Sequence, residues 1–246
     1  MTEVEVPGPV PRMELTEWRR YNVVAGITWR GTAPSPFDLG LSGTNTPVSL
    51  VMENWQRLIE SFPESRSVTM ARQVHGSEIR WQEPACGLVI QHGIDGHAIE
   101  KPGALIAITL ADCIPVYVVD PVGRRAALVH AGWRGTAGGI LPKAIELLMA
   151  RGSLVENVLV HCGVGICGRC YEVGSEVFEA LGLPVPSTGK GLLDLRNVLA
   201  TQARYAGVSH VSISDHCSAH EASLFFSHRG SGGLDGRMVG YLGFVA

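Results

Sequence analysis

Three short segments of the chain each carry one residue that can bind a metal ion. They are Gln73-Val74-His75-Gly76, Ala111-Asp112-Cys113 and His130-Ala131-Gly132. Each ligand stands at the edge of an apolar run, where a strand is expected to end. Two imidazoles and one thiolate can hold a zinc ion and leave its fourth coordination position open for water or substrate. The sequence therefore predicts a catalytic metal centre made by His75, Cys113 and His130.

A second chemistry uses the same side chains without a metal. Cys113 would be a covalent nucleophile, with His130 or His75 as its base. A cysteine ligand and a cysteine nucleophile both need a lowered thiol pKa and a nearby imidazole, so the sequence leaves both possibilities open. A buried structural cysteine is the simplest alternative. The adjacent Asp112 argues against it, because a carboxylate is costly to bury unless something pairs with it.

A non-enzymatic binding protein with a structural zinc site is a further hypothesis. Such a site would have four protein ligands and no open coordination position. The fourth ligand would come from Tyr171, Glu172 or Glu176, which otherwise belong to the polar start of a helix. A site with three protein ligands beside a cleft would argue against this hypothesis.

A glycine-rich segment, residues 132–139, follows His130 and leads into an expected helix. Backbone N–H groups at the start of a helix, together with a fixed positive charge, can receive an anion such as phosphate. The segment lacks the G-x-x-x-x-G-K-[ST] pattern of a Walker motif. We predict that Arg134 and the helix start after Gly135 bind phosphate, with Arg229 as a second candidate.

The chain has six cysteines in 246 residues, too few for a small disulfide scaffold, so free thiols in a reducing compartment are expected. Cys167 and Cys170 form a C-x-x-C pair, which suits a redox pair, half of a structural zinc site or a tight glycine turn. A four-ligand zinc site would need a second pair at suitable spacing. We interpret His216 and His220, on either side of Cys217, as loop residues without a metal role.

Composition limits the classes of partner. With 46% hydrophobic and 17% charged residues, the chain is expected to form one compact domain over residues 1–246. A net charge of -3 and a pI near 6.3 predict no binding to nucleic acid or membrane, so a small-molecule substrate is expected. The acidic, proline-containing start of the sequence does not resemble an export signal, and we expect a cytoplasmic protein. No apolar run reaches the roughly 20 residues that span a bilayer.

Strands are expected to outnumber helices. Apolar runs rich in Val, Ile, Leu and Ala predict central strands at 68–74, 104–110, 115–119, 126–129 and 158–160. Helices are predicted at 52–62, 138–150, 175–181 and 195–205, the last with Asp194 as its N-cap and an end near Gly207. The strands between 68 and 108 leave no room for intervening helices. An α+β fold with mixed sheets in a sandwich-like core and flanking helices is therefore predicted.

Taken together, these segments resemble the YfiH/YlmD family, also known as the peptidoglycan editing factor or laccase-like multicopper polyphenol oxidoreductase family. The resemblance covers most of the chain. It rests on Gln73-Val74-His75-Gly76, Ala111-Asp112-Cys113-Ile114-Pro115-Val116, His130-Ala131-Gly132-Trp133-Arg134-Gly135, Cys170-Tyr171-Glu172-Val173-Gly174, Asp194-Leu195, Phe226-Ser227-His228-Arg229 and Gly236-Arg237.

The resemblance implies a metal site at His75, Cys113 and His130, with zinc expected and copper as the alternative. It implies phosphorolysis of adenosine, inosine and methylthioadenosine, together with adenosine deamination. In the deamination, zinc-bound water with a pKa near 7 would attack C6 of adenine, and the amino group would leave as ammonia. Arg30 loosely matches an arginine-bearing turn of the family and is the third expected substrate contact, beside Arg134 and Arg229. The expected partners are a nucleoside and phosphate, and the protein is expected to be a monomer or a homodimer.

Two further activities belong to the family. One is a cytoplasmic amidase that edits UDP-MurNAc peptidoglycan precursors carrying L-Ser, and it would suit Cys113 as ligand or nucleophile. The other is copper-dependent oxidation of polyphenols. We consider true laccase chemistry the weaker alternative, because multicopper clusters use many histidines, often as H-x-H pairs. The nine histidines of this chain form no such pair.

Overall fold

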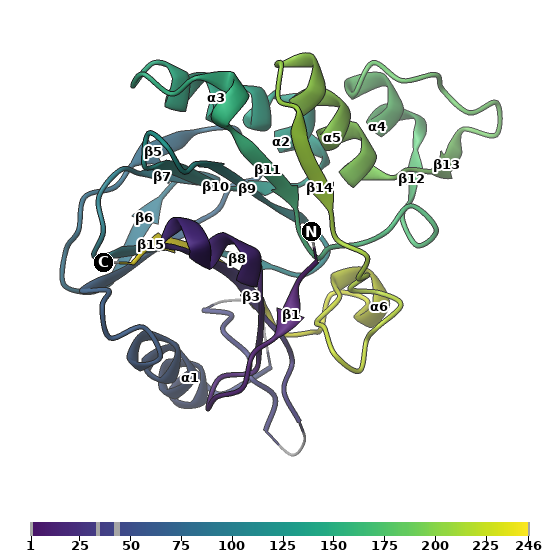
Figure 1. The fold of residues 1–246 in the computed structure, drawn as a ribbon. Coiled ribbons are helices and arrows are strands. Elements are labelled where there is room, and N and C mark those ends of the chain that lie inside the picture. The colour runs from purple at the N-terminus through teal and green to yellow at the C-terminus, as the bar shows by residue number, and fades with distance from the viewer. Residues whose placement is uncertain (1, 33–34, 42–44, 246) are drawn as a thin grey trace.

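Two β-sheets packed face to face form the centre of the protein, with helices on their outer faces, in the computed structural model shown in Figure 1. The structure describes residues 2–32, 35–41 and 45–245. Both sheets contain parallel and antiparallel strand pairs. The predicted α+β class, with mixed sheets and flanking helices, is therefore confirmed.

The first sheet has seven strands in the order β1-β2-β3-β15-β8-β4-β6. They are β1 (Val4–Glu5), β2 (Arg12–Glu14), β3 (Val23–Thr28), β15 (Met238–Phe244), β8 (Ala104–Leu110), β4 (Ser67–Arg72) and β6 (Gly87–His92). β4 runs parallel to both β6 and β8, and the other pairs are antiparallel. β15, from the end of the sequence, lies between β3 and β8 and so joins distant parts of the chain.

The second sheet has six strands in the order β14-β11-β9-β10-β7-β5. They are β14 (His210–Ile213), β11 (Leu159–Cys162), β9 (Ile114–Asp120), β10 (Arg125–Ala131), β7 (Gly96–Ile99) and β5 (Ile79–Trp81). The pairs β11–β14 and β5–β7 are parallel, and the others are antiparallel. A small ribbon of β12 (Glu172–Gly174) and β13 (Lys190–Leu192) lies apart from both sheets.

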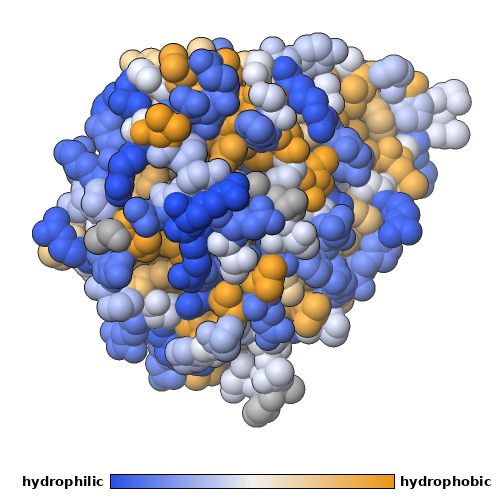
Figure 2. Space-filling view, viewed as in Figure 1, coloured by the Kyte–Doolittle hydropathy of each residue, from blue (hydrophilic) through white to orange (hydrophobic). Residues whose placement is uncertain are grey.

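The helices are short and lie on the outside of the sheets. They are α1 (Val48–Glu60), α2 (Trp133–Ala137), α3 (Ile140–Met149), α4 (Ser175–Ala180), α5 (Leu195–Tyr205) and α6 (His228–Ser231), with 3₁₀ turns η1 (Thr16–Tyr21) and η2 (Val155–Asn157). None of the described helices combines the length and the apolar character needed to cross a membrane. On the side shown in Figure 2, hydrophobic and hydrophilic residues are interspersed.

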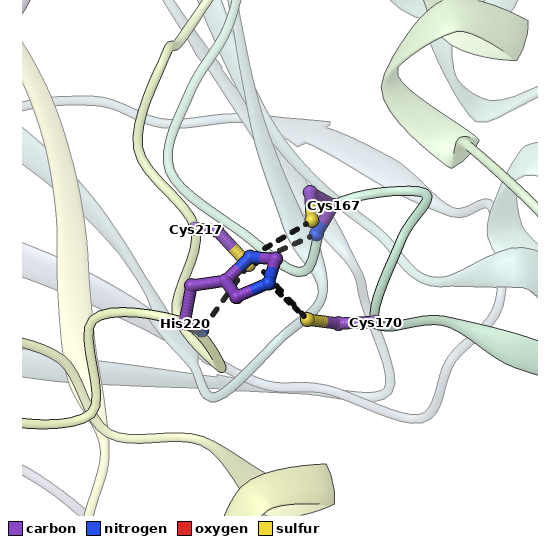
Figure 3. Close-up of side chains that lie close together, drawn as sticks. All are labelled: Cys167, Cys170, Cys217 and His220. Carbon is purple, nitrogen blue, oxygen red and sulfur yellow. Dashed lines mark hydrogen bonds between the residues drawn. The ribbon is translucent and has the colours of Figure 1, made fainter.

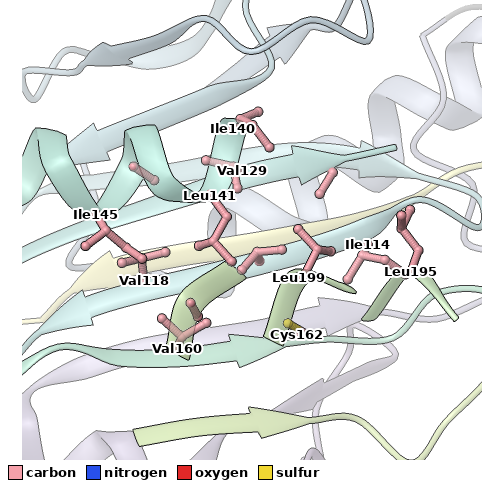
Figure 4. Close-up of a cluster of buried hydrophobic side chains, with 14 of the residues drawn as sticks. Ile114, Val118, Val129, Ile140, Leu141, Ile145, Val160, Cys162, Leu195 and Leu199 are labelled. Atoms are coloured by element: carbon pink, nitrogen blue, oxygen red, sulfur yellow. The ribbon is translucent and has the colours of Figure 1, made fainter. Parts of the chain in front are cut away.

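Three apolar clusters hold the layers together. Side chains such as Ile106 of β8 and Leu128 of β10 fill the space between the two sheets. Trp55 of α1 packs on the outer face of the first sheet. α3 and α5 cover the outer face of the second sheet, where Ile145 and Leu199 lie among strand residues (Figure 4). The central strands are buried on both faces, which explains why they are continuous apolar runs rather than alternating ones.

The predicted elements agree closely with the observed ones. β8 and α5 have the predicted bounds, and Asp194 caps α5 by accepting hydrogen bonds from the backbone N–H groups of Arg196 and Asn197. The helix predicted over 138–150 differs at its start. The chain first forms α2 directly after Gly132, and Gly139, with a φ of 72°, separates α2 from α3. The helix start expected after Gly135 is thus wrong, because Gly135 lies inside α2.

Candidate metal centre

His75, Cys113 and His130 converge, as their residue types predict. One ligand atom from each lies within 4.8 Å of the others, and the two imidazole ring centroids are 5.0 Å apart at an angle of 77°. The three residues come from three chain segments. His75 follows β4, Cys113 joins β8 to β9, and His130 belongs to β10. His75 is exposed, Cys113 is half-buried and His130 is buried, so the group opens to solvent on one side.

Asp95, which the sequence alone does not reveal as a site residue, positions two of the three ligands. Its fully buried carboxylate accepts hydrogen bonds from the backbone N–H groups of Val74, His75 and Gly76 at 3.1, 2.9 and 2.7 Å. It also contacts Nδ1 of His130 at 2.9 Å. One carboxylate therefore fixes the turn that carries His75 and the ring of His130, leaving Nε2 of that ring available for a ligand.

The backbone conformation of the turn at residues 73–76 also determines the position of His75. His75 has a φ of 59°, in the left-handed region that side-chain-bearing residues seldom adopt. Next to it, the Gln73 side chain bonds the backbone of Thr109 through both its amide nitrogen and its oxygen, at 2.8 and 3.0 Å. These bonds continue the pairing of β4 with β8 beyond the last strand residue. The turn that presents His75 is therefore tied to the strand that leads to Cys113.

The position of Cys113 depends on the hydrogen bonds of its neighbour Asp112. Asp112 has a φ of 86°, and its buried carboxylate accepts hydrogen bonds from the Ser218 hydroxyl and the Arg229 backbone N–H, both at 2.6 Å. These are the partners that a buried carboxylate needs. They connect the strand break at Cys113 to the loop that carries Ser218 and to helix α6, which carries Arg229.

Gly132 allows the three ligands to approach each other. A methyl group at Gly132 would lie 3.1 Å from Sγ of Cys113 and 3.3 Å from Cδ2 of His75. Both distances are shorter than normal van der Waals contacts. Gly132, two residues after His130, thus leaves the space that the centre requires.

The charges of the group are strongly coupled. Burial raises the pKa of Cys113, but His130 and then His75 lower it by charge and hydrogen bonding, to about 6. Burial lowers the pKa of His130, but Cys113 and the hydrogen bond to Asp95 raise it to about 9. Burial also raises the pKa of Asp95, yet the hydrogen bonds from His130 and Gly76 keep that pKa below its ordinary value. In the absence of a metal, these shifts favour the thiolate form of Cys113 and the protonated form of His130.

A pocket of about 880 Å³ opens beside the three ligands. Four arginines line it, and among the described residues of the lining Asp112, with its partners already in place, is the single acidic one. The arginines are Arg72, Arg134, Arg229 and Arg237. Apolar and aromatic side chains complete the wall: Leu41, Met70, Ile90, Trp133 and Tyr171. The pocket is thus suited to an anion together with a flat, partly apolar group.

The predicted substrate contacts differ in their position. Arg134 is exposed at the pocket and stacks on Trp133 at 4.2 Å. Arg229 stacks on Tyr171 and donates to the backbone oxygen of Glu172. Arg30 lies outside the pocket lining, where its guanidinium pairs with Asp235 at 2.6 Å.

A second group of metal-binding side chains lies beside this pocket and outside its lining. Ligand atoms of Cys167, Cys170, Cys217 and His220 are all within 4.8 Å of one another. Cys217 and His220 form the second pair that a four-ligand zinc site needs, whereas the sequence alone indicates a loop residue without a metal role at His220. His216, the residue before Cys217, instead bonds Glu221 at 2.9 Å.

Fold and site together define a class of protein: a two-sheet α+β protein with a Cys/His centre at the mouth of an arginine-lined pocket. The family model described as multi-copper polyphenol oxidoreductase laccase matches residues 29–245. The chain belongs to this family, and the resemblance seen in the sequence is confirmed.

Relatives with assigned activities support the same relationship. The chain is 34% identical to purine nucleoside phosphorylase YlmD of Geobacillus stearothermophilus over 247 residues, covering 89% of each chain. It is 38% identical to a purine nucleoside phosphorylase of Deinococcus radiodurans, covering 87% of this chain and 85% of the relative. Adenosine deaminase RL5, from an unknown prokaryote, is 36% identical over 59% of this chain and 60% of its own. The predicted kinship with phosphorylases and a deaminase is thus confirmed.

Solved structures share the whole architecture. The crystal structure of YlmD from Geobacillus stearothermophilus superposes with a TM-score of 0.87 at 30% identity, covering 99% of this chain and 100% of that one. A crystal structure of the Bacillus licheniformis protein YfiH gives 0.84 at 26% identity, covering 96% and 97%.

Proposed function

We propose that the protein is a metal-dependent purine nucleoside phosphorylase that also deaminates adenosine. The observation that carries this proposal is the position of the His75, Cys113 and His130 group at a pocket lined by four arginines. Phosphorolysis needs an anion, a purine nucleoside and a polarising group in one cavity. The names of the phosphorylase and deaminase relatives support the same pair of reactions.

The donor set fits a metal ion. One thiol and two imidazoles are ligands that zinc accepts, and Asp95 orients His130 as a carboxylate commonly does for a zinc-bound histidine. Three protein ligands beside an open pocket argue for a catalytic centre and against the structural zinc site of a binding protein. We propose zinc, with copper as the alternative. When bound, such an ion acts as a Lewis acid on a substrate oxygen or nitrogen and lowers the pKa of water.

The pocket residues have separable tasks. Arg134 and Arg229 are the proposed phosphate contacts, since guanidinium groups bind phosphate oxygens through paired hydrogen bonds. Trp133 and Tyr171 hold these two guanidiniums by stacking, which limits their motion. Ile90 and its apolar neighbours would contact the purine ring. In the reaction, a phosphate oxygen bonds to C1′ of the ribose while the bond to the purine nitrogen breaks and its electron pair leaves with the base.

A direct test incubates protein of known metal content with adenosine, with and without phosphate, and separates adenine, inosine and hypoxanthine. Adenine that forms only with phosphate, together with ribose 1-phosphate, supports phosphorolysis, whereas inosine without phosphate supports deamination. Cys113→Ala should abolish both products, and Cys86→Ala, at an exposed free cysteine, is the matched control. Full activity of Cys113→Ala, or no product with the metal-loaded protein, would contradict the proposal.

The geometry also favours a second candidate, hydrolysis of an amide by Cys113. Asp95, Nδ1 of His130 and the thiol of Cys113 form the order of orienting acid, base and nucleophile that cysteine hydrolases use. The proposed substrate is a UDP-MurNAc precursor carrying L-Ser. Release of free serine from this precursor by metal-free protein, with no adenine from adenosine, would favour this candidate over phosphorolysis.

A cytoplasmic location and a monomeric or dimeric state remain predictions.

Arg30 remains a proposed substrate contact of lower rank than Arg134 and Arg229. Its side chain bonds Asp235 and the backbone oxygen of Phe225, and it stacks on Phe226 at 4.4 Å. Substrate contact would require the guanidinium to leave these partners. If Arg30→Gln raised the KM for phosphate as strongly as Arg134→Gln does, a direct contact would be supported.

A further inference from the structure

We propose that Cys167, Cys170, Cys217 and His220 form a second metal centre, a structural zinc site that fastens two loops beside the pocket. Figure 3 shows the four side chains pointing toward one another from two chain segments. Sγ of Cys167 lies 3.3 Å from Nδ1 of His220, and Sγ of Cys170 lies 3.4 Å from both ring nitrogens. This inference is independent of the chemistry proposed for His75, Cys113 and His130.

The donor set and spacing match structural zinc sites. Cys167 and Cys170 are separated by two residues, and so are Cys217 and His220. Three thiolates and one imidazole form a recognised tetrahedral zinc ligand set, often supplied by two such pairs. With zinc–sulfur bonds of about 2.3 Å and zinc–nitrogen bonds of about 2.0 Å, ligand atoms in a tetrahedron lie roughly 3.4–3.8 Å apart. The observed upper limit of 4.8 Å requires only small side-chain movements to reach this geometry.

Backbone hydrogen bonds fix the direction of the Cys217 side chain. The N–H groups of Cys167 and His220 point at Sγ of Cys217, at 3.3 and 3.5 Å. Hydrogen bonds to a ligating sulfur stabilise its negative charge and fix its direction. Cys167 and Cys217 are buried, Cys170 is half-buried and His220 is exposed, so the group can take up a metal from solvent. Four protein ligands fill a tetrahedral shell, which indicates a structural rather than a catalytic role.

The location explains what such a site would stabilise. Ser218, between Cys217 and His220, donates to the carboxylate of Asp112, the residue before Cys113. Next to Cys170, Tyr171 forms part of the pocket wall. The two loops meet at an isolated β-bridge between Gly165 and Cys217, and the Ser218 N–H donates to the backbone oxygen of Gly165 at 3.1 Å. A zinc ion here would fix Ser218 and Tyr171, and thereby the walls around the first centre.

The test uses a background variant, His75→Ala with Cys113→Ala, which lacks the first centre. Purified without chelator and with reductant, it should contain one zinc ion per chain by elemental analysis. Adding Cys170→Ser should remove this zinc, whereas adding Cys86→Ser should not, because Cys86 is an exposed cysteine outside the cluster. His220→Cys keeps four ligands and should retain the metal. A chelator should lower the Tm of the background variant but not that of the Cys170→Ser variant.

Three results would overturn the proposal: a background variant that binds no stoichiometric zinc, zinc retained after Cys170→Ser, or a Cys167–Cys170 disulfide in protein purified from reducing conditions. If Cys170→Ser fails to fold, Co²⁺ titration of the folded background variant decides. A tetrahedral spectrum with thiolate charge-transfer bands supports the site, and an octahedral spectrum contradicts it. None of these measurements involves a nucleoside, so their failure is distinct from a failure of the proposed enzymatic function.

Discussion

At the scale of single residues, the first centre depends on a buried carboxylate as well as on its three ligands. Asp95 contacts the His130 ring and three consecutive backbone N–H groups around His75. Because the ligands come from separate segments of the chain, a contact between segments must fix their relative positions. A single acceptor shared between two segments performs this task.

We predict that Asp95→Asn weakens metal binding at this centre by about 10–100-fold, the usual effect of losing a carboxylate that orients a histidine ligand. The amide keeps the volume but removes the charge and one acceptor position. The dissociation constant is measured by competition with a chromophoric chelator. Asp120→Asn is the matched control, because Asp120 is also buried and bonds backbone N–H groups of its own turn. Equal affinities in all three proteins would contradict the assigned role.

Gly132→Ala tests the space between the ligands. The added methyl group would press on Cys113 and His75 at 3.1 and 3.3 Å, so both side chains must move by a few tenths of an ångström. We expect weaker metal binding and a reduced kcat, with a loss in folding free energy of about 1–3 kcal/mol, as for other overpacked sites. Metal affinity and chemical denaturation measure the two effects. Unchanged metal affinity would show that the ligands have more room than the geometry indicates.

At the scale of elements, continuous apolar runs were sufficient to predict the strands that carry the ligands. β8 has the predicted bounds, and the runs at 115–119 and 126–129 lie inside β9 and β10. These strands are buried on both faces, so burial alone determines their composition. β7 was not predicted, because its four residues, Gly-His-Ala-Ile, include a glycine and a histidine that hide the apolar pattern.

The residue types also identified His75, Cys113 and His130, but they could not identify Asp95 or His220. An aspartate before a short strand has the appearance of an ordinary turn residue, and its partners lie 19–35 positions away. His220 contacts Cys167 across 53 positions. Such contacts arise from sheet topology, which a single sequence does not specify. The helix start was misplaced for a local reason, because α2 begins directly after Gly132 and the left-handed Gly139 separates it from α3.

β7 carries a histidine whose burial should give the protein a measurable pH dependence. Burial lowers the pKa of His97 to about 3, opposed in part by the backbone of Ala107. Between the unfolded pKa near 6.5 and the folded value, the unfolded chain binds one more proton than the folded chain. Stability should therefore fall as the pH is lowered through this range, by up to about 1.4 kcal/mol per pH unit from this group.

His97→Leu removes this titration and should flatten the pH dependence of the unfolding free energy between pH 6.5 and 4. Urea denaturation at several pH values measures it. His210→Leu is the control, because His210 lies on the edge strand β14 and is exposed. If the wild type and His97→Leu had parallel profiles, the histidine would not be held neutral in the folded state.

At the scale of the whole molecule, the two sheets are joined by polar contacts as well as by apolar packing. The Tyr117 hydroxyl, from the second sheet, donates to the backbone oxygen of Gly26 in the first at 2.7 Å. The side chain of Glu3, next to β1, reaches Nε2 of His161 on β11 at 3.0 Å. Both side chains of this second pair are at most 2% exposed. The opposite ring nitrogen of His161 contacts Ser212 on β14, so the pair belongs to a buried network across the sheets.

Glu3→Ala should therefore destabilise the whole fold, although Glu3 lies near the start of the sequence and far from the pocket. Removing Glu3 leaves Nε2 of the buried His161 without its hydrogen-bond partner, which costs about 1–3 kcal/mol. Glu5→Ala changes the same charge at an exposed position of β1 and should have little effect.

Burial raises the pKa of Glu3, but the hydrogen bond and charge of His161 lower it overall, below 4.5. Its contribution should thus be present above pH 4.5 and be lost as the pH falls through the folded pKa, so the difference between wild type and Glu3→Ala should shrink in acid. Urea denaturation at pH 7 and at pH 4 measures this difference, and a constant difference at both pH values would contradict an ionised Glu3 in the folded protein.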